Sequence, residues 1–342
     1  MKATIFDGST QRPFTSADAA ALSSTTPYAW VDVLYSEPKD PEVLGLLQQM
    51  GFSDIVANYT TRSSSRGMFQ AFGDNMLACT FAAGDDDGPP VLVQCVWNTG
   101  CLVTIRRGAD QAIATALNDL KPTASRLFEH PGPVPGIVMQ LVVDSIGRQL
   151  TQIQTEVGFL DGQIILTSKP SQLEQLQQLR APLTALGTTM PPYLENLREC
   201  LLAPASLPGM DTTGVQALQT YAACVTDIVQ EISSAAGDVR NAIEDYQGQV
   251  SSAQGGRINQ LTLVSTIFLP ISFLTGYFGQ NFQYLTNETL SFASWFALGV
   301  VLPITVVLVS VVLLRKGGFS IGRPARFHLR HRPPQKDGAS TS

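Results

Sequence analysis

The stretch that decides the fold is NQLTLVSTIFLPISFLTGYFGQNF, residues 259–282. Residues 261–278 within it carry no charge, and a second uncharged run, SWFALGVVLPITVVLVSVVLL, follows at 294–314. A helix of that second length is about 31 Å long, which matches a bilayer hydrocarbon core of about 30 Å. We therefore expect transmembrane helices at 258–279 and 294–314, joined by a loop at 280–293.

The charges around the two runs predict their orientation. The loop between them has no Lys or Arg and a single acid, Glu288, whereas the tail at 315–342 is basic. Positive charge favours the cytoplasmic side. The chain is therefore expected in the cytoplasmic (inner or plasma) membrane as a multi-pass protein with both termini in the cytoplasm and 280–293 outside. The tail is interpreted as an orientation signal and a contact for membrane lipid, rather than as a nucleic-acid arm.

The composition excludes several classes of function. Of the 342 residues, 15% are charged, and residues 1–256 hold 14 basic against 26 acidic side chains. An acidic chain is a poor partner for phosphate, so nucleic acid is not expected as a ligand. The five cysteines are scattered without a C-x-x-C spacing, which is not typical of a disulfide scaffold or a zinc site. No P-loop, G-x-S-x-G or H-E-x-x-H motif occurs, so no enzyme is predicted.

The sequence pattern divides the part of the chain expected in the cytoplasm into two regions ahead of the stalk. Residues 1–135 are expected to form an α/β domain that ends at the HPGPVPG stretch, 130–136. A helical bundle is expected at 136–210, in which Pro191 and Pro192 interrupt or kink the second helix. The apolar and turn-forming runs predict strands at 3–6, 29–34, 76–82, 91–97 and 102–105, and helices at 41–50, 110–120, 137–166 and 170–202.

A third helix is expected to begin near Asp211 and to run without a break from 213 to 277. Its stalk part, 211–257, carries apolar residues at steps of three or four, from Leu218 to Ala253. Such a stripe must be buried, either against the two preceding helices or about an oligomer axis, and both can hold together because a long helix has two faces.

The first uncharged run ends in Gly279-Gln280-Asn281, and residues 28–32 read YAWVD. In these motifs and in its layout the chain resembles the CorA-type divalent metal-ion transporter superfamily. The resemblance implies an α+β cytoplasmic domain and a long α-helical stalk continuing into the first of two C-terminal transmembrane helices. It also implies a funnel-shaped homo-oligomer, a homopentamer. The implied function is transport of a divalent cation, Mg²⁺ first and also Co²⁺ or Ni²⁺, with that transported or regulatory cation as the sole ligand.

Two other functions stay open. Gln280 stands where magnesium-transporting members have Met, and the loop at 285–290 also departs from their pattern. A ZntB-like zinc transporter is therefore the alternative. A membrane-anchored scaffold or binding protein is the rival from a different class, although a mere tether would not need a polar first span.

The resemblance and the helical spacing together propose a pathway. A ring of Asn281 amides, with Gly279 and Gln280, would bind a hydrated ion weakly enough to release it. Alternatively, Gln280 only packs against a neighbouring helix. Below that ring, hydroxyl and apolar side chains would alternate along the pore, unless the hydroxyls bond back to their own helix. These pore-lining candidates are Ser272, Leu269, Ser265 and Leu261.

Acidic residues supply the remaining candidates. Glu288 would form an external ring that concentrates cations, or it is a solvated loop acid. The resemblance implies that cytoplasmic carboxylates bind regulatory divalent ions between neighbouring copies, but no local motif fixes a pair. The candidates are Asp85, Asp86, Asp87, Asp227, Glu231, Asp238, Glu244 and Asp245.

Overall fold

The computed structural model describes residues 1–22, 28–35, 41–60, 69–85, 88–202, 207–279 and 292–316. The chain forms two compact units, Met1–Gln249 and Val250–Ser342. The expected 1–135 and 136–210 regions and most of the stalk therefore lie in one unit. The finer divisions of the chain stay predictions.

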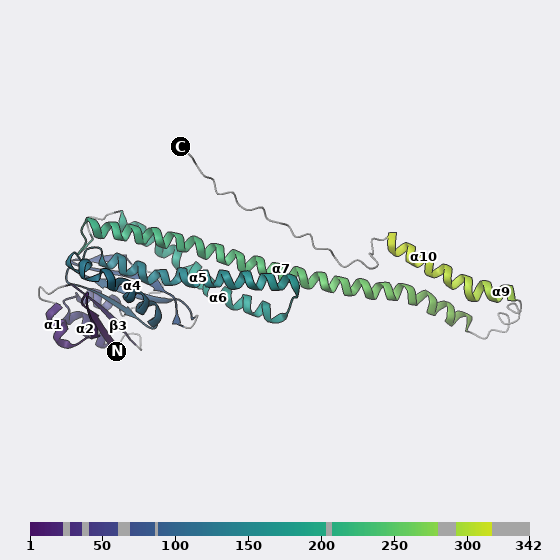
Figure 1. Ribbon diagram of the computed structural model, residues 1–342, viewed down its shortest axis with the longest axis horizontal. Helices are drawn as coiled ribbons and strands as arrows, with labels where there is room; N and C mark the ends of the chain where they lie inside the picture. The colour runs from purple at the N-terminus through teal and green to yellow at the C-terminus, as the bar shows by residue number, and fades with distance from the viewer. Residues whose placement is uncertain are drawn as a thin grey trace, which may run out of the picture. The chain divides into compact units, whose positions relative to one another are not determined.

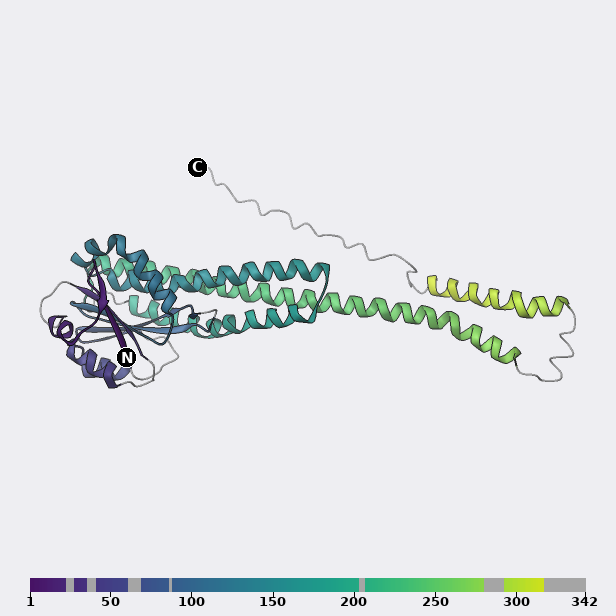
Figure 2. The same cartoon turned by 60° about the horizontal axis from the view of Figure 1, so that its bottom comes forward.

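A seven-stranded sheet is the centre of the first unit (Figures 1 and 2). The strand order is β2-β1-β3-β7-β6-β5-β4, with β3 and β7 parallel and the other neighbours antiparallel. All five expected strands are confirmed to within a residue. The strands are β1 Lys2–Phe6, β2 Gln11–Pro13, β3 Ala29–Leu34, β4 Phe69–Phe72, β5 Asn75–Ala82, β6 Val91–Trp97 and β7 Cys101–Arg106.

Short helices cover one face of this sheet. They are α1 (Ser16–Leu22), α2 (Pro41–Gln49) and α3 (Asp54–Thr60), and they share a buried core with Val31 and Val33 of β3. Because successive side chains of a strand point to opposite faces, Trp30 and Asp32 lie on the other face. That second face is covered by α4 and α5 (Figures 1 and 2).

Two of the long helices, α4 and α6, continue through proline residues. Helix α4 (Asp110–Glu129) continues nine residues past its expected end, through Pro122, because Ala124 and Phe128 extend its buried stripe. Helix α5 spans Val134–Leu166. Helix α6 runs continuously over Pro170–Leu201, so the expectation that Pro191 and Pro192 interrupt it was wrong, whereas the alternative of a kink at that pair stays a prediction. Burial on both sides of that Pro-Pro pair outweighs the lost backbone hydrogen bonds.

Helix α7 spans Thr212–Phe278, within a residue of the expected bounds. Asp211 caps its start, since its Oδ1 accepts the backbone N–H of Gly214 at 2.7 Å. The expected stripe is buried from Leu218 to Tyr246, which confirms the interpretation as a bundle within the chain. A chain of buried hydroxyls ties three elements together: Tyr193 of α6 contacts Tyr221 of α7 at 2.6 Å, and Tyr221 donates to Thr80 of β5 at 2.8 Å.

The second unit holds the end of α7 and a second helical run. That run is α9 (Phe292–Phe296), a π-helical turn η3 (Ala297–Val301) and α10 (Leu302–Lys316). Within the described residues, α7 is the one helix both long and apolar enough to cross a membrane, and none of its apolar window is buried. The run Ala297–Val312 is apolar but shorter. Two membrane crossings and the cytoplasmic position of both termini stay predictions.

Candidate ion pathway

The pore-lining candidates lie along one stripe of α7. At 100° per residue, Leu261, Ser265, Leu269, Ser272 and Gly279 fall within an arc of about 80°. Leu261 is 68% exposed and Leu269 is 75% exposed, and the side chains of Ser265 and Ser272 are exposed as well. Hydroxyl and apolar side chains therefore alternate along a face that the second unit leaves open.

Hydrogen bonding separates the serines of this helix from its threonines. The hydroxyls of Thr262, Thr266 and Thr275 donate to backbone carbonyls one turn earlier, at 2.8–3.0 Å. Those of Ser265 and Ser272 make no hydrogen bond within the described part of the chain. The interpretation as back-bonded hydroxyls thus holds for the threonines, while both serine hydroxyls stay available to a ligand or to water.

The predicted selectivity motif begins where α7 ends. The backbone N–H of Gly279 donates to the Thr275 carbonyl at 2.9 Å and closes the last helical turn. The carboxyl end of a helix carries unpaired carbonyls and partial negative charge, which favours a cation nearby. Gln280, Asn281 and Glu288 lie outside the described residues, so their roles stay predictions.

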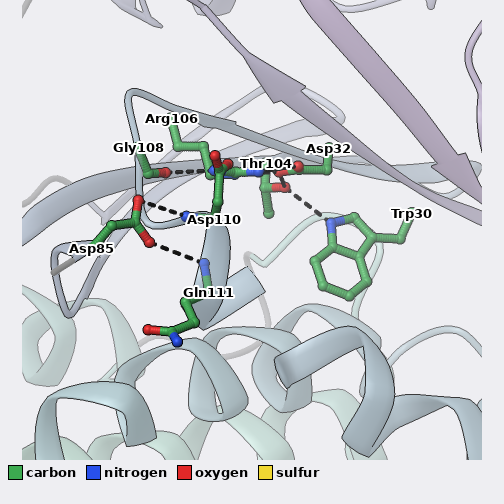
Figure 3. A network of polar contacts seen from close by, with 8 residues as sticks. All are labelled: Trp30, Asp32, Asp85, Thr104, Arg106, Gly108, Asp110 and Gln111. Atoms are coloured by element: carbon green, nitrogen blue, oxygen red, sulfur yellow. Dashed lines mark hydrogen bonds and ion pairs between the residues drawn. The ribbon is translucent and has the colours of Figure 1, made fainter. Parts of the chain in front are cut away.

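In the first unit, Asp85 caps helix α4. Its two carboxylate oxygens accept the backbone N–H groups of Asp110 and Gln111, both at 3.0 Å (Figure 3). Partial burial opposes ionisation of Asp85, but these bonds, one from Ala109 and the charge of Arg106 outweigh it and lower its pKa. The structure therefore gives Asp85 a capping role, and its predicted regulatory role is untested. Asp86 and Asp87 lie outside the described residues.

Behind this cap lies a buried polar network that the sequence did not reveal (Figure 3). Arg106 pairs with Asp32 at 2.9 Å and also bonds Asp110, and both Arg106 and Asp32 are at most 7% exposed. Thr104 donates to Asp32 at 2.7 Å and accepts from the Trp30 indole at 3.0 Å. The network joins β3, β7 and the start of α4, so it supports the fold of the first unit.

The comparison with known families decides the class of protein. The model of the family described as CorA-like Mg²⁺ transporter protein matches residues 27–316, which is most of the chain. The chain belongs to this family. As a CorA-family protein it is a divalent metal-ion transporter and not an enzyme, which confirms the resemblance inferred from the motifs.

Individual CorA-like relatives are distant. YfjQ of Bacillus subtilis, named as a metal ion transporter, is 21% identical over 64% of this chain and 68% of its own length. The cobalt/magnesium transport protein CorA of Thermotoga maritima is 23% identical over 50% of this chain and 48% of its own length. At such identities the relatives do not fix the transported ion.

Solved structures show the same fold. The CorA magnesium transporter of Methanocaldococcus jannaschii superposes with a TM-score of 0.72 at 17% identity, covering 94% of this chain and 99% of that one. The cytoplasmic domain of ZntB from Vibrio parahaemolyticus superposes with a TM-score of 0.53 at 14% identity, covering 74% and 98%. The CorA-like fold, an α+β domain with a long helix, is therefore established.

For a CorA-like transporter, the remaining carboxylate candidates are exposed on α7. Asp227, Glu231, Asp238, Glu244 and Asp245 show no preformed site: the described residues contain no group of three or more His, Cys, Asp or Glu placed to hold a metal. The sequence analysis did not identify Asp161 on α5, a carboxyl that interacts with Asp245. Burial and the charge of Asp245 raise the pKa of Asp161.

We expect Asp85→Ala to destabilise the first unit by about 1 kcal/mol, the usual value of a helix cap. Because the pKa of Asp85 is lowered by folding, its contribution is present above its unfolded pKa of about 3.9 and is lost as the pH falls through the folded value. Urea unfolding of the two proteins at neutral and acidic pH measures this. Equal stability of both proteins at neutral pH would contradict the capping role.

Proposed function

We propose that the chain carries hydrated Mg²⁺ across the cell membrane through a homopentameric, channel-like pore. The observation that carries this proposal is the open stripe of α7, whose two unbonded serine hydroxyls alternate with leucines and lead to Gly279-Gln280-Asn281. Repeated about a symmetry axis, the stripe gives rings of hydroxyl oxygens that alternate with rings of apolar side chains along the pore. Oxygen rings can hold a hydrated ion weakly, and apolar rings can close a pore by dewetting.

Mg²⁺ suits such a pore because it gives up its waters reluctantly and is readily held through them. A ring of neutral Asn281 amides at the outer mouth would bind the hydrated ion without trapping it, and Glu288 would raise the local cation concentration. Entry of a doubly charged ion gains about 4.6 kcal/mol per 100 mV of membrane potential. Cytoplasmic divalent ions bound by exposed acids such as Asp238, Glu244 and Asp245 would close the pore.

Zinc transport is the second candidate, favoured by Gln280 in place of a methionine thioether beside Asn281. Glutamine offers both an acceptor and a donor, so it can orient the Asn281 amides or add oxygens of its own. The likeness to the ZntB cytoplasmic domain concerns the fold alone and does not separate the two ions.

The purified chain in proteoliposomes tests the proposal. We expect Mg²⁺ influx driven by an inside-negative potential, with Co²⁺ and Ni²⁺ competing, and a particle of five copies by light scattering. Zn²⁺ flux without Mg²⁺ flux would select the zinc alternative. A monomeric particle, or the absence of any divalent flux, would overturn the pore and favour the scaffold.

The serine and threonine hydroxyls give a sharper expectation. Ser272→Ala should reduce Mg²⁺ flux by up to about tenfold. At this position every copy of the chain loses a hydroxyl able to bond a charged, hydrated ion. Thr266→Val is the matched control, since that hydroxyl is already bonded to the Thr262 carbonyl at 2.8 Å. Initial rates in proteoliposomes measure both. Equal rates for the two variants would remove Ser272 from the pathway.

A further inference from the structure

The second unit carries its charges at one end of its two helical runs. On α7, Arg257 is the single charged residue of the whole stretch 246–278. On the other run, the charged residues are Arg315 and Lys316, the last two of α10. The part of this unit that the structure describes contains no acid. Its positive charge is therefore not compensated by its own side chains.

Helix lengths place Arg257 and Lys316 at a matching depth. At 1.5 Å per residue, α7 rises about 32 Å from Arg257 to Phe278, and the run from Phe292 to Lys316 rises about 36 Å. Both lengths slightly exceed a hydrocarbon core of about 30 Å. The two runs lie alongside each other in both views (Figures 1 and 2). In the predicted membrane hairpin, both side chains therefore fall at the headgroup level of the cytoplasmic leaflet.

Both side chains are available to an anion. Arg257 and Lys316 are exposed, and neither forms an ion pair with another described residue. Their long stems can lie along apolar surface while the charged heads reach polar surroundings. The guanidinium offers paired donors that match a phosphate, and the ammonium adds a second point charge. At this depth the surroundings supply such an anion as the phosphate of a phospholipid.

Arg257 also lies beside the proposed ion pathway. At 100° per residue it stands about 80° from the centre of the arc that holds Leu261, Ser265, Leu269 and Ser272. A bare arginine at this place in every copy opposes the passage of a doubly charged cation. A bound phosphate cancels that charge, so the occupant of the site bears on transport.

We propose that Arg257 and Lys316 bind the phosphate of an anionic phospholipid, and that this lipid neutralises the positive charge beside the inner end of the pathway. The site rests on the predicted membrane hairpin, and its effect on flux rests on the proposed function. Phosphatidylglycerol carries a net negative charge that complements the two cations, whereas the choline of phosphatidylcholine balances its own phosphate. The site is distinct from the rest of the basic tail, because both residues lie on described helices.

Lipid binding by the full-length protein is the first measurement. Protein stripped of lipid in a nonionic detergent is equilibrated with phosphatidylglycerol or phosphatidylcholine, and the bound lipid is extracted and counted. We expect Arg257→Gln and Lys316→Gln each to weaken phosphatidylglycerol binding about fivefold. That factor corresponds to about 1 kcal/mol for each basic side chain near an anionic surface.

The double variant Arg257→Gln/Lys316→Gln has a matched control in Arg330→Gln/Arg332→Gln, which removes the same charge from the tail. The control should bind phosphatidylglycerol as the wild type does. Equal binding by the two double variants, or equal binding of both lipids by the wild type, would overturn the site. Inorganic phosphate is added as a competitor and should not displace the lipid. If it does, the site belongs to a soluble phosphate and the lipid proposal fails.

Flux in proteoliposomes is the second measurement. Replacing part of the phosphatidylcholine by phosphatidylglycerol should raise Mg²⁺ flux more in the wild type than in the double variant Arg257→Gln/Lys316→Gln. The surface charge of the membrane acts on both proteins alike, so their difference isolates the site. Equal responses would overturn the effect on the pathway. Lipid binding that depends on the two residues, without flux in any membrane, would support the site and remove only the proposed function.

Discussion

Asn281→Ala is expected to abolish Mg²⁺ flux while the protein still folds and assembles. Asn281 lies two positions after Gly279, which is the last described residue at the carboxyl end of α7. We place its amide at the outer mouth. Losing even two hydrogen bonds to a charged, hydrated ion, at about 1.5 kcal/mol each, reduces binding about 100-fold. Flux in proteoliposomes measures the effect, and light scattering checks the assembly.

The matched control is Asn287→Ala, which removes an amide from the same predicted external loop. Its flux should stay near that of the wild type, because Asn287 lies outside the Gly279-Gln280-Asn281 motif. If Asn281→Ala transports Mg²⁺ as fast as Asn287→Ala, the outer amide ring is not the selectivity site.

The long elements could be predicted because their patterns are local. The α7 stripe repeats every three or four residues over many turns, so its bounds followed to within a residue. The β6–β7 hairpin is also local: Asn98-Thr99-Gly100 joins its two strands, and the Asn98 side chain accepts the Gly100 backbone N–H at 2.8 Å. The sequence pattern ended α4 too early and predicted an interruption or kink at Pro191-Pro192 of α6. It could not show the tertiary burial of residues such as Phe128 and Tyr193, which offsets the backbone bond lost at a proline.

Features that depend on distant partners could not be predicted. Asp32 and Arg106 are 74 positions apart, and their pairing requires the parallel alignment of β3 with β7. No local sequence pattern predicts that alignment. In the pathway, helical spacing placed Ser265 and Ser272 on one stripe, but only the hydrogen bonding in the structure distinguishes their hydroxyls from those of the threonines.

Arg106→Met is expected to destabilise the first unit, Met1–Gln249, by about 3–5 kcal/mol, the cost of leaving a buried charge without its partner. Asp32 is 7% exposed and, among the residues that the structure describes, would keep only the Thr104 hydroxyl as a side-chain donor. The bonds from Arg106 to Asp110 and to the Gly108 carbonyl are lost as well. Because Trp30 donates to Thr104 within the network, urea unfolding followed by tryptophan fluorescence reports the change.

Two further variants test whether the stability lost in Arg106→Met comes from breaking the buried ion pair or merely from removing a charged side chain. Arg12→Met removes an arginine that pairs with Asp18 at 2.6 Å but is 47% exposed, so it should cost much less stability than Arg106→Met. The double variant Asp32→Leu/Arg106→Met removes both buried charges and should regain much of the stability, because an apolar pair needs no compensation. Equal losses for Arg106→Met and Arg12→Met would show that the network contributes no more than a surface contact. A double variant less stable than Arg106→Met would show that the cost lies in packing rather than in the orphaned carboxylate.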